Sequence, residues 1–398
     1  MAELNDVVMV AGARTATGTF LGTLKDVKAY DMGAACVKEI MARAGIPGED
    51  VDEVIFGNQF QAGNNANPAR WAALRGGLPD CVPAFTPMKN CGTALKAVIL
   101  GAQSIQTGDN AVVLVGGMES MSRCPYYLLD ARQGYRMGHG PTVRDGLFED
   151  GLLDPVVGGH MGLTAENLAE RYKISREEQD EFALESHHKA EAAWAAGVFA
   201  ADVVPLTIKK KKGDPIIFDH DETYRKGLTM ADLARLKPAF VKDGTVTPGN
   251  ASPLNDGAAA ALLMTPEKAR EYGLQPLVKY VASASVGYDP HYMGFSPVFA
   301  VRKLLAKTGL TLDDIGVIEL NEAFAVQAIA CIRELGMDPG RVNVNGGAIA
   351  LGHPTGCTGA RLTVSIASEM RRSGHKYGMV TLCIGGGQGI AALYELCE

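Results

Sequence analysis

The sequence predicts a layered α/β fold made of two related halves, and three observations support this prediction. Short runs rich in Val and Ile alternate with helix-length apolar segments towards both ends of the chain, a pattern typical of strands covered by helices on both faces. One unit of helix end, acidic turn and strand occurs twice. The length of 398 residues exceeds the usual size of one compact domain, which fits two core-forming halves.

The repeated unit is seen once in each half. In residues 45–58 a helix ends at Gly45, an acidic turn follows, and Val54-Ile55-Phe56 is typical of a strand. Residues 309–321 show the same order from Gly309, with one residue fewer before the strand. This recurrence indicates a duplicated domain, although α/β proteins in general reuse such units.

A second matched pair supports the duplication. Residues 95–106 have a helical pattern that ends at Gly108, and an apolar strand then leads into two glycines. Residues 361–372 have the same pattern, end at Gly374, and are followed by a strand that leads into glycines 385–387. The order of elements therefore matches at two separate places in the halves.

The stretch between the halves has a different character. It is rich in Gly, Met and charge, and it contains a long amphipathic helix over 176–196. Residues 209–214, four lysines with Gly and Asp, predict a solvated hairpin tip, with a phosphate contact as the weaker alternative. We divide the chain into an N-terminal α/β half (1–119), an inserted loop domain (120–251), a return to the first half (252–270) and a C-terminal α/β half (271–398).

Composition argues against several classes of function. A net charge of -7 provides no basic field for nucleic acid, and no apolar run is long enough to span a bilayer. Neither end resembles a secretory signal or an organelle tag, so we expect a cytoplasmic protein. Eight cysteines without a CxxC pair indicate reduced thiols and no metal site.

Cys91 is the candidate nucleophile. It directly precedes the first apolar helix, so we expect its sulfur at a helix N-terminus, where N–H groups and the helix dipole lower a thiol pKa and stabilise an oxyanion. Most cysteines are small buried hydrophobes, and it is this position that distinguishes Cys91.

His353 and Cys383 are the further chemical candidates. His353 lies in a glycine-rich loop, between Gly352 and Pro354, and is suited to activate a thiol and then face an oxyanion. A dinucleotide-binding loop is the rival interpretation, but the acidic residue that this motif requires is missing. Cys383 ends the last long strand, where ligands bind in open α/β sheets. The strand over 390–393 argues against a phosphate loop there.

Together with the segment Asn321-Glu322-Ala323-Phe324-Ala325, these residues resemble the thiolase family over essentially the whole chain. Further stretches that resemble the family are 116–122, 160–166, 247–252 and 255–258. The resemblance implies a duplicated five-layer α/β/α/β/α fold with an inserted loop domain. It also implies an acyltransferase that makes or breaks a carbon–carbon bond between coenzyme A thioesters through an acyl-cysteine.

The resemblance implies a role for each site residue. Cys91 would take the acyl group, His353 would activate it, and Cys383 would move the proton of the reacting carbon. The amides of Cys91 and Gly385 would form one oxyanion hole, and His353 with a water held by Asn321 would form the other. Coenzyme A thioesters would be substrates, with no cofactor bound permanently, and the residues that bind coenzyme A would be Ser252, His160, Met161, Arg225, Met293, Ala323 and Phe324.

The family likeness also bears on assembly. Thiolases form dimers that pair into tetramers through the loop domain, so we expect a homo-oligomer. An exposed apolar cover is expected to support it, formed by Met118, Met121, Tyr126, Tyr127, Leu128 and Leu129. Gly92-Thr93-Ala94 departs from the small Ser-Gly type pair usual after the nucleophile, which we expect to alter packing, subunit contact or substrate shape.

Several activities remain as alternatives. A decarboxylating β-ketoacyl synthase does not need Cys383, and a non-catalytic acyl-CoA binding protein does not need the chemical residues. A cysteine hydrolase would use Cys91 and His353 without an acceptor thiol. Within the family, residues 160–162 resemble the covering loop of short-chain enzymes, which favours acetyl-CoA acetyltransfer over a 3-ketoacyl-CoA thiolase of broader chain length in β-oxidation.

Overall fold

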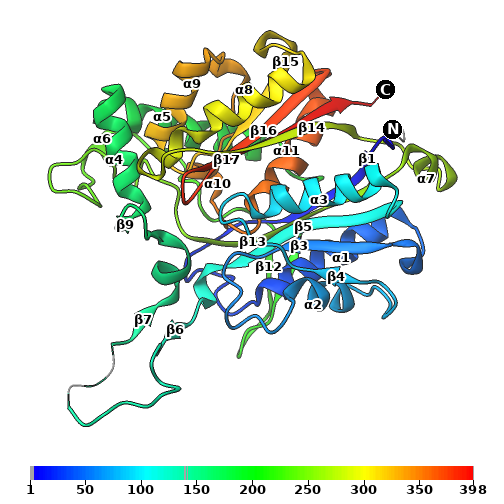
Figure 1. Cartoon of the computed structure of the whole chain (residues 1–398), viewed down its shortest axis with the longest axis horizontal. Coiled ribbons are helices and arrows are strands. Elements are labelled where there is room, and N and C mark those ends of the chain that lie inside the picture. Colours follow the sequence, from blue (N-terminus) through cyan, green and yellow to red (C-terminus); the bar gives the residue numbers. More distant parts are fainter. Residues whose placement is uncertain (1–3, 139, 141, 398) are drawn as a thin grey trace.

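Helices and sheet alternate in five layers through the molecule, as seen from top to bottom of Figure 1. The computed structural model describes residues 4–138, 140 and 142–397 of the chain. The helices of the five layers are, from one outer layer through the middle to the other, α1 (Ala29–Ala44) and α2 (Pro68–Arg75), then α3 (Thr93–Thr107) and α11 (Thr358–Ser373), then α8 (Ser296–Thr308) and α9 (Ala325–Leu335). The middle helices α3 and α11 therefore pack against strands of both halves.

The main strands form one continuous sheet in the order β15-β16-β17-β14-β1-β13-β5-β3-β4. Their bounds are β1 (Val8–Thr15), β3 (Glu53–Gly57), β4 (Ala84–Phe85), β5 (Val112–Ser120), β13 (Asn255–Met264), β14 (Val278–Gly287), β15 (Ile315–Leu320), β16 (Tyr377–Ile384) and β17 (Gln388–Leu396). Two smaller strands lie beside this path: β2 (Gly18–Thr19) pairs with β13, and β10 (Val203–Val204) pairs with β1.

The sheet has the same order when it is followed outward from the β1–β14 contact in either direction. One direction gives β1-β13-β5-β3 and the other gives β14-β17-β16-β15. Directions match as well, because β3–β5 and β15–β16 are parallel and the other pairs in both series are antiparallel. A register shift occurs at Met9/Ala11 in β1 and at Tyr280/Ala282 in β14. The duplication predicted from the sequence is therefore confirmed, and so is the five-layer fold.

The repeated sequence unit forms the same structure twice. After α1, Gly45 takes φ 61°, a short 3-10 turn follows over Gly48–Asp50, and β3 begins. After α8, Gly309 takes φ 72°, the turn is Leu312–Asp314, and β15 begins. A left-handed residue at the helix end favours glycine, because a Cβ clashes in that conformation.

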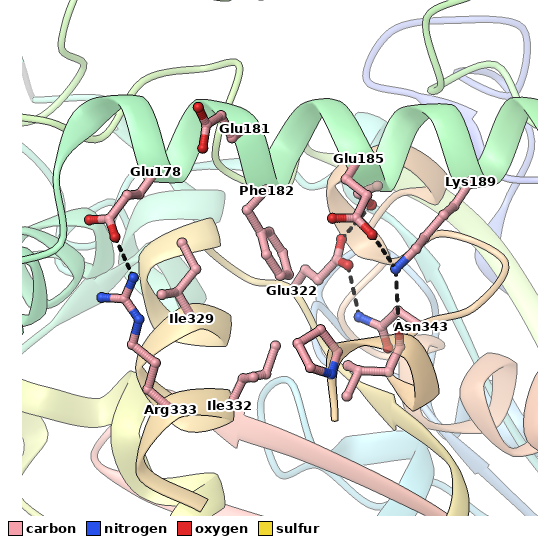
Figure 2. Close-up of a pocket in the computed structure, with 13 residues that line it drawn as sticks. Glu178, Glu181, Phe182, Glu185, Lys189, Glu322, Ile329, Ile332, Arg333 and Asn343 are labelled. Atoms are coloured by element: carbon pink, nitrogen blue, oxygen red, sulfur yellow. Dashed lines mark hydrogen bonds and ion pairs between the residues drawn. The ribbon is translucent and has the colours of Figure 1, made fainter. Parts of the chain in front are cut away.

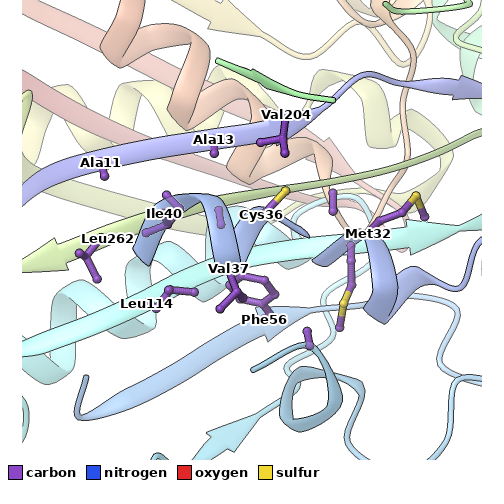
Figure 3. Packing of buried hydrophobic residues seen from close by; sticks show 14 of the residues in the cluster. Ala11, Ala13, Met32, Cys36, Val37, Ile40, Phe56, Leu114, Val204 and Leu262 are labelled. Carbon is purple, nitrogen blue, oxygen red and sulfur yellow. The ribbon is translucent and has the colours of Figure 1, made fainter. Parts of the chain in front are cut away.

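Buried aliphatic side chains fill the space between the outer helix α1 and the sheet (Figure 3). Val37 and Ile40 of α1 are fully buried against side chains of the sheet that include Leu114 and Leu262. On the other face of the sheet, small residues bring the two middle helices together. A Cβ at Gly359 of α11 would lie 2.2 Å from the backbone nitrogen of Leu95 in α3, so only glycine permits this approach.

Residues 121–251 contain the short elements η2 (Met121–Arg123), β6 (Tyr126–Tyr127), β7 (Arg144–Asp145), η3 (Phe148–Leu152), β8 (Leu153–Asp154) and β9 (Gly159–His160). They also contain α4 (Met161–Tyr172), α5 (Arg176–Ala195), β11 (Leu206–Ile208), β12 (Ile216–Phe218) and α6 (Met230–Ala234). A capping box between Ser175 and Glu178 starts α5, which confirms the long predicted helix. The β11–β12 hairpin, with exposed lysines at its tip, confirms the predicted hairpin.

We propose that residues 120–251 form the inserted domain, because β5 ends at Ser120 and the sheet resumes with β13 at Asn255. A loop held at its base by β6 and β7 extends far from the body (Figure 1). The expected apolar cover is wrong in part, since Met118 and Met121 are buried beneath the sheet end, while Tyr126 and Leu129 are 66% and 60% exposed. No helix within the described ranges is long and apolar enough to cross a membrane.

Candidate active site

Two equivalent loops supply the candidate nucleophile and base. Cys91 precedes α3, and His353 lies between the short helix α10 (Ala348–Leu351) and α11. Because α3 and α11 touch at Leu95 and Gly359, their first turns lie together and so do the two loops. The duplication therefore places one reactive side chain before each middle helix.

The remaining chemical residues come from the ends of the parallel strands β15 and β16. Asn321 directly follows β15, and Cys383 and Gly385 lie at and just beyond the end of β16. Asn90 connects this edge with the nucleophile loop, because its Nδ2 donates to the Gly385 carbonyl at 3.2 Å. Asn90 adopts φ 45°, a left-handed conformation that asparagine tolerates better than most residues.

A cavity of about 470 Å³ joins these groups to the inserted domain. Ten of the twelve predicted site residues line it, namely Cys91, His353, Gly385, Ser252, His160, Met161, Arg225, Met293, Ala323 and Phe324. The other two, Asn321 and Cys383, are fully buried behind its wall. Asn321 contacts His353, and the proximity of Cys91 contributes to the raised pKa of Cys383. The structure therefore gathers all twelve into one region.

The hydrogen bonds of His353 define its tautomer. Thr358 Oγ1 donates its only hydrogen to the Pro354 carbonyl at 3.0 Å, so it accepts from His353 Nδ1 at 2.7 Å. Nδ1 therefore carries the hydrogen and Nε2 carries the lone pair. Asn321 Nδ2 lies 3.4 Å from Nε2, in position to donate to it. The basic nitrogen of the imidazole is thus Nε2, which faces away from Thr358 and towards Asn321.

Burial keeps this imidazole neutral. Desolvation, together with the nearby Arg361 guanidinium, lowers the pKa of His353 to about 3. The His353 backbone N–H donates to Asn255 Oδ1 at 2.8 Å, which fixes the loop from the first half. A neutral, oriented imidazole is the form that accepts a proton from a thiol.

The expectation of an acidic Cys91 is wrong for the resting protein. Burial raises the pKa of the Cys91 thiol to about 11, and the backbone N–H groups of Gly385 and Cys91 offset this only in part. The helix begins at Thr93 with Gly92 as its N-cap, so the thiol lies outside the first turn. The hydrogen bonds of the His353 ring go to Asn321 and Thr358 and not to Cys91, and contacts between a nucleophile and its base commonly tighten only when substrate is bound.

The unusual residues after the nucleophile have a local role. Thr93 is fully buried, and its hydroxyl accepts the backbone N–H of Lys89 at 2.7 Å, which closes the turn that carries Cys91. Ala94 packs closely against Gly117, since a Cβ at Gly117 would lie 2.6 Å from the Ala94 methyl group. Both side chains therefore act on the packing of the loop.

The predicted coenzyme A residues form the outer part of the cavity. His160 stacks on Phe240 with ring centroids 4.6 Å apart, and its pKa is lowered by burial. Ser252 donates from N and Oγ to the Ala323 carbonyl, at 3.0 Å in both cases, and so ties the segment that directly follows the inserted domain to the segment after β15. Met161 reaches the glycine turn, because a Cβ at Gly385 would lie 2.6 Å from its methyl carbon.

Glu119 is a buried carboxylate that connects three segments around the site. It accepts backbone N–H bonds from Gln59 and Phe60 after β3 and from Gly356 in the histidine loop, at 3.1, 3.2 and 2.8 Å. It also accepts from the Asn58 and Thr355 side chains. Burial raises the pKa of Glu119 to about 7, so this link titrates near neutral pH.

A second hollow, of about 360 Å³, lies between α5 and α9, with Glu322 among its lining residues (Figure 2). At its floor Glu322 accepts from Ser186 Oγ at 2.7 Å, from Asn343 Nδ2 at 2.8 Å and from Ile349 N at 3.1 Å. Glu322 thereby links α5, the segment of Asn321 and the segment that leads to His353. Its acidic rim carries ion pairs such as Lys189–Glu185 at 2.8 Å.

Sequence reasoning missed several lining residues. Thr355, which lines the cavity, and Thr358, which accepts from His353, lie in or next to the histidine loop that the sequence analysis had already singled out. Gln59, Phe148, Leu152 and Phe240 belong to segments without a motif, and only the packing of the inserted domain brings them to the cavity. Among the residues that the structure describes, no group of three or more His, Cys, Asp or Glu side chains has an arrangement that could hold a metal ion.

Comparison with known proteins gives a consistent result. Models of the thiolase N-terminal domain and of the thiolase C-terminal domain match residues 7–267 and 274–396. An acetyl-CoA acetyltransferase of Pseudomonas aeruginosa is 52% identical over 388 residues, 98% of this chain and 98% of that protein. The crystal structure of the Bacillus anthracis acetyl-CoA acetyltransferase is 46% identical with a TM-score of 0.97, and human mitochondrial 3-ketoacyl-CoA thiolase in complex with CoA is 40% identical with a TM-score of 0.95, each comparison covering 100% of both chains.

Proposed function

The chain belongs to the thiolase family, and on that premise we propose that it is an acetyl-CoA acetyltransferase that condenses two acetyl-CoA molecules reversibly to acetoacetyl-CoA and coenzyme A. The observation that carries the proposal is the arrangement of Cys91, neutral His353 and the Gly385 amide around one cavity. The similarity of the chain to two enzymes named acetyl-CoA acetyltransferase supports the acetyl substrate.

In the first half-reaction Cys91 becomes acylated. His353 Nε2 takes the thiol proton, and the thiolate attacks the acetyl-CoA carbonyl. The amides of Cys91 and Gly385 stabilise the oxyanion, and the C–S bond to coenzyme A breaks. Cys383 protonates the departing coenzyme A thiolate. This step leaves an acetyl-cysteine, a protonated His353 and a Cys383 thiolate.

Those protonation states suit the second half-reaction. The Cys383 thiolate removes a proton from the methyl group of a second acetyl-CoA, and the raised pKa of Cys383 makes this thiolate a strong base. Protonated His353 donates to the enolate oxygen, supported by Asn321. The enolate carbon attacks the acetyl-cysteine, a carbon–carbon bond forms, and the Cys91 thiolate leaves and recovers its proton from His353.

Requirement for an acceptor thiol tests the proposed class of reaction. Purified protein with acetoacetyl-CoA should form acetyl-CoA only when free coenzyme A is added. A cysteine hydrolase would release free acid without it. An acyl-CoA binding protein would turn over nothing, and a decarboxylating synthase would require malonyl-CoA for condensation.

Chain length separates the proposal from its main alternative. A 3-ketoacyl-CoA thiolase of broader range in fatty acid metabolism would cleave long substrates well. The human protein of similar structure is named a 3-ketoacyl-CoA thiolase. We favour short acyl groups, because Met121, Phe148 and Leu152 surround the cavity beside Gln59. A thiolysis profile over 3-oxoacyl-CoA chain lengths should therefore peak at acetoacetyl-CoA.

We also propose a cytoplasmic homo-oligomer, a dimer or tetramer. Eight free thiols suit a reducing compartment. The loop that follows η2 presents Tyr126, Leu128 and Leu129 to solvent, which is unfavourable unless another surface covers them. A second copy of the chain is the occupant that the family membership favours.

A further inference from the structure

Gln59 presents an unused amide to the catalytic cavity. It follows β3, lines the cavity together with Cys91 and His353, and is only 6% exposed. Its Oε1 is buried and has no hydrogen-bond partner among the residues that the structure describes. Buried amides are rarely left unpaired in proteins, so an atom in this condition beside a ligand cavity indicates a ligand group that pairs with it.

The surrounding structure fixes the backbone of Gln59 and packs against its side chain. Its backbone N–H donates to Glu119 at 3.1 Å, and the next N–H, that of Phe60, donates to the same carboxylate. The turn η3 packs against the side chains of both Gln59 and Phe60, because a Cβ at Gly151 would lie 2.5 Å from Phe60 Cζ and 2.6 Å from Gln59 Nε2. Glycine at position 151 leaves the space that the amide occupies.

The neighbours of this amide select the chemistry of its partner. Met121, Phe148 and Leu152 are apolar cavity residues, and the one basic side chain with a permanent charge on the lining, Arg225, also lines the separate hollow at the coenzyme end. A ligand carboxylate placed against the Gln59 amide would therefore lack a counter-charge. A neutral hydroxyl fits, since it donates to Oε1 and accepts from Nε2.

We propose that Gln59 is a specificity-determining residue, and that the enzyme accepts short 3-oxoacyl-CoA thioesters that carry a hydroxyl group on the acyl chain. This inference rests on the proposed thiolase activity and names a substrate class for the same site. The hydroxyl replaces the missing partner of the amide, so the hydroxylated substrate is bound better than its unsubstituted analogue.

The test compares kcat/KM for thiolysis of 3-oxohexanoyl-CoA with that of its 4-, 5- and 6-hydroxy derivatives. The three derivatives place the hydroxyl group at increasing distances from the thioester. Wild-type protein should prefer at least one hydroxylated substrate by about tenfold or more. In Gln59→Met, which keeps the volume, this ratio should fall towards one. Gly151→Ala should lower the same ratio, because its methyl group would crowd both the Gln59 amide and the Phe60 ring.

Gln61→Met is the matched control. Gln61 lies two residues further on, and its amide already donates to the Asn58 carbonyl at 3.1 Å. The ratio should be unchanged in this variant. A wild-type ratio of one for all three derivatives, or a ratio that survives in Gln59→Met, would overturn the inference. Acetoacetyl-CoA thiolysis by the wild type is measured in parallel, because its absence would refute the proposed function itself.

Discussion

Burial decides the resting protonation of Cys91 and His353, the two residues that we propose start the reaction. It raises the pKa of Cys91 to about 11 and lowers that of His353 to about 3, so both groups are neutral at pH 7. An ion pair of thiolate and imidazolium is therefore not the resting state. We therefore expect the thiolate to form only once substrate has bound.

Alkylation of Cys91 by iodoacetamide should accordingly rise about tenfold per pH unit from pH 7 to near 11, because only the thiolate reacts. Peptide mass mapping against time measures this rate. Cys81 is exposed and will be labelled as well, so bromoacetyl-CoA, which resembles the substrate, should be needed to make modification selective for Cys91. A rate that is flat between pH 7 and 9 would instead show a preformed ion pair.

The two active-site cysteines should separate by half-reaction. Cys383→Ala should still take an acetyl group from acetyl-CoA onto Cys91, because His353 and the oxyanion amides remain. Condensation should fall by roughly a hundredfold or more, the usual scale for the loss of a general base. Cys91→Ala should neither take up an acetyl group nor catalyse condensation. Intact-protein mass after incubation with acetyl-CoA, paired with acetoacetyl-CoA turnover, measures both, and near-normal turnover in Cys383→Ala would refute its role.

At the scale of elements, Glu119 determines how the β3 loop and the histidine loop meet. Its pKa is raised to about 7, so it is ionised above that pH and loses an acceptor site as pH falls through 7. Wild-type kcat/KM should therefore decline on the acid side near pH 7, well above the pKa of about 3 of His353. In Glu119→Gln this limb should disappear, with activity reduced about tenfold at pH 8.

Glu53→Gln is the control for that profile. Glu53 also has a raised pKa from burial, but it lies at the start of β3 and pairs with Asn110 rather than with the catalytic loops. Its substitution should leave the acid limb in place. Persistence of the limb in Glu119→Gln would assign it to another group.

The sequence predicted those helices and strands well whose ends are determined by interactions between residues close in sequence. Helix ends at Gly108 and Gly374 and the capped start of α5 follow from backbone conformation and short-range hydrogen bonds. The mirrored sheet order does not, because contacts such as β1 with β13 and β14 join distant segments. The raised pKa of Cys91 was missed for the same reason, since burial is a property of the whole fold.

Site residues divide in the same way. The loops of Cys91 and His353 carry recognisable motifs, so their meeting was predictable from the family likeness. Gln59 and Phe148 have no motif around them, and they meet at the cavity because η3 of the inserted domain packs against residues 59 and 60, just after β3. Long-range packing was therefore the part that sequence could not supply.

At the scale of the whole molecule, the extended loop predicts association between copies. Tyr126→Asp with Leu129→Asp should lower the mass of the assembly in light scattering, because two charges replace exposed apolar side chains. Ile217→Asp is the matched control, since Ile217 is 55% exposed in the β11–β12 hairpin and should leave the mass unchanged. A wild-type monomer at micromolar concentration would refute the association itself.

The position of β1 at the centre of the sheet has a consequence for synthesis on the ribosome. Val8 pairs with Met264 and with Lys279, which are made long after it. At roughly 5–20 residues per second, β1 waits roughly 10–50 s for its neighbours. During that time a nascent chain exposes an apolar strand with both edges open, a state prone to aggregation. Cys383 emerges later still, so the nucleophile is translated well before the residues that make it useful.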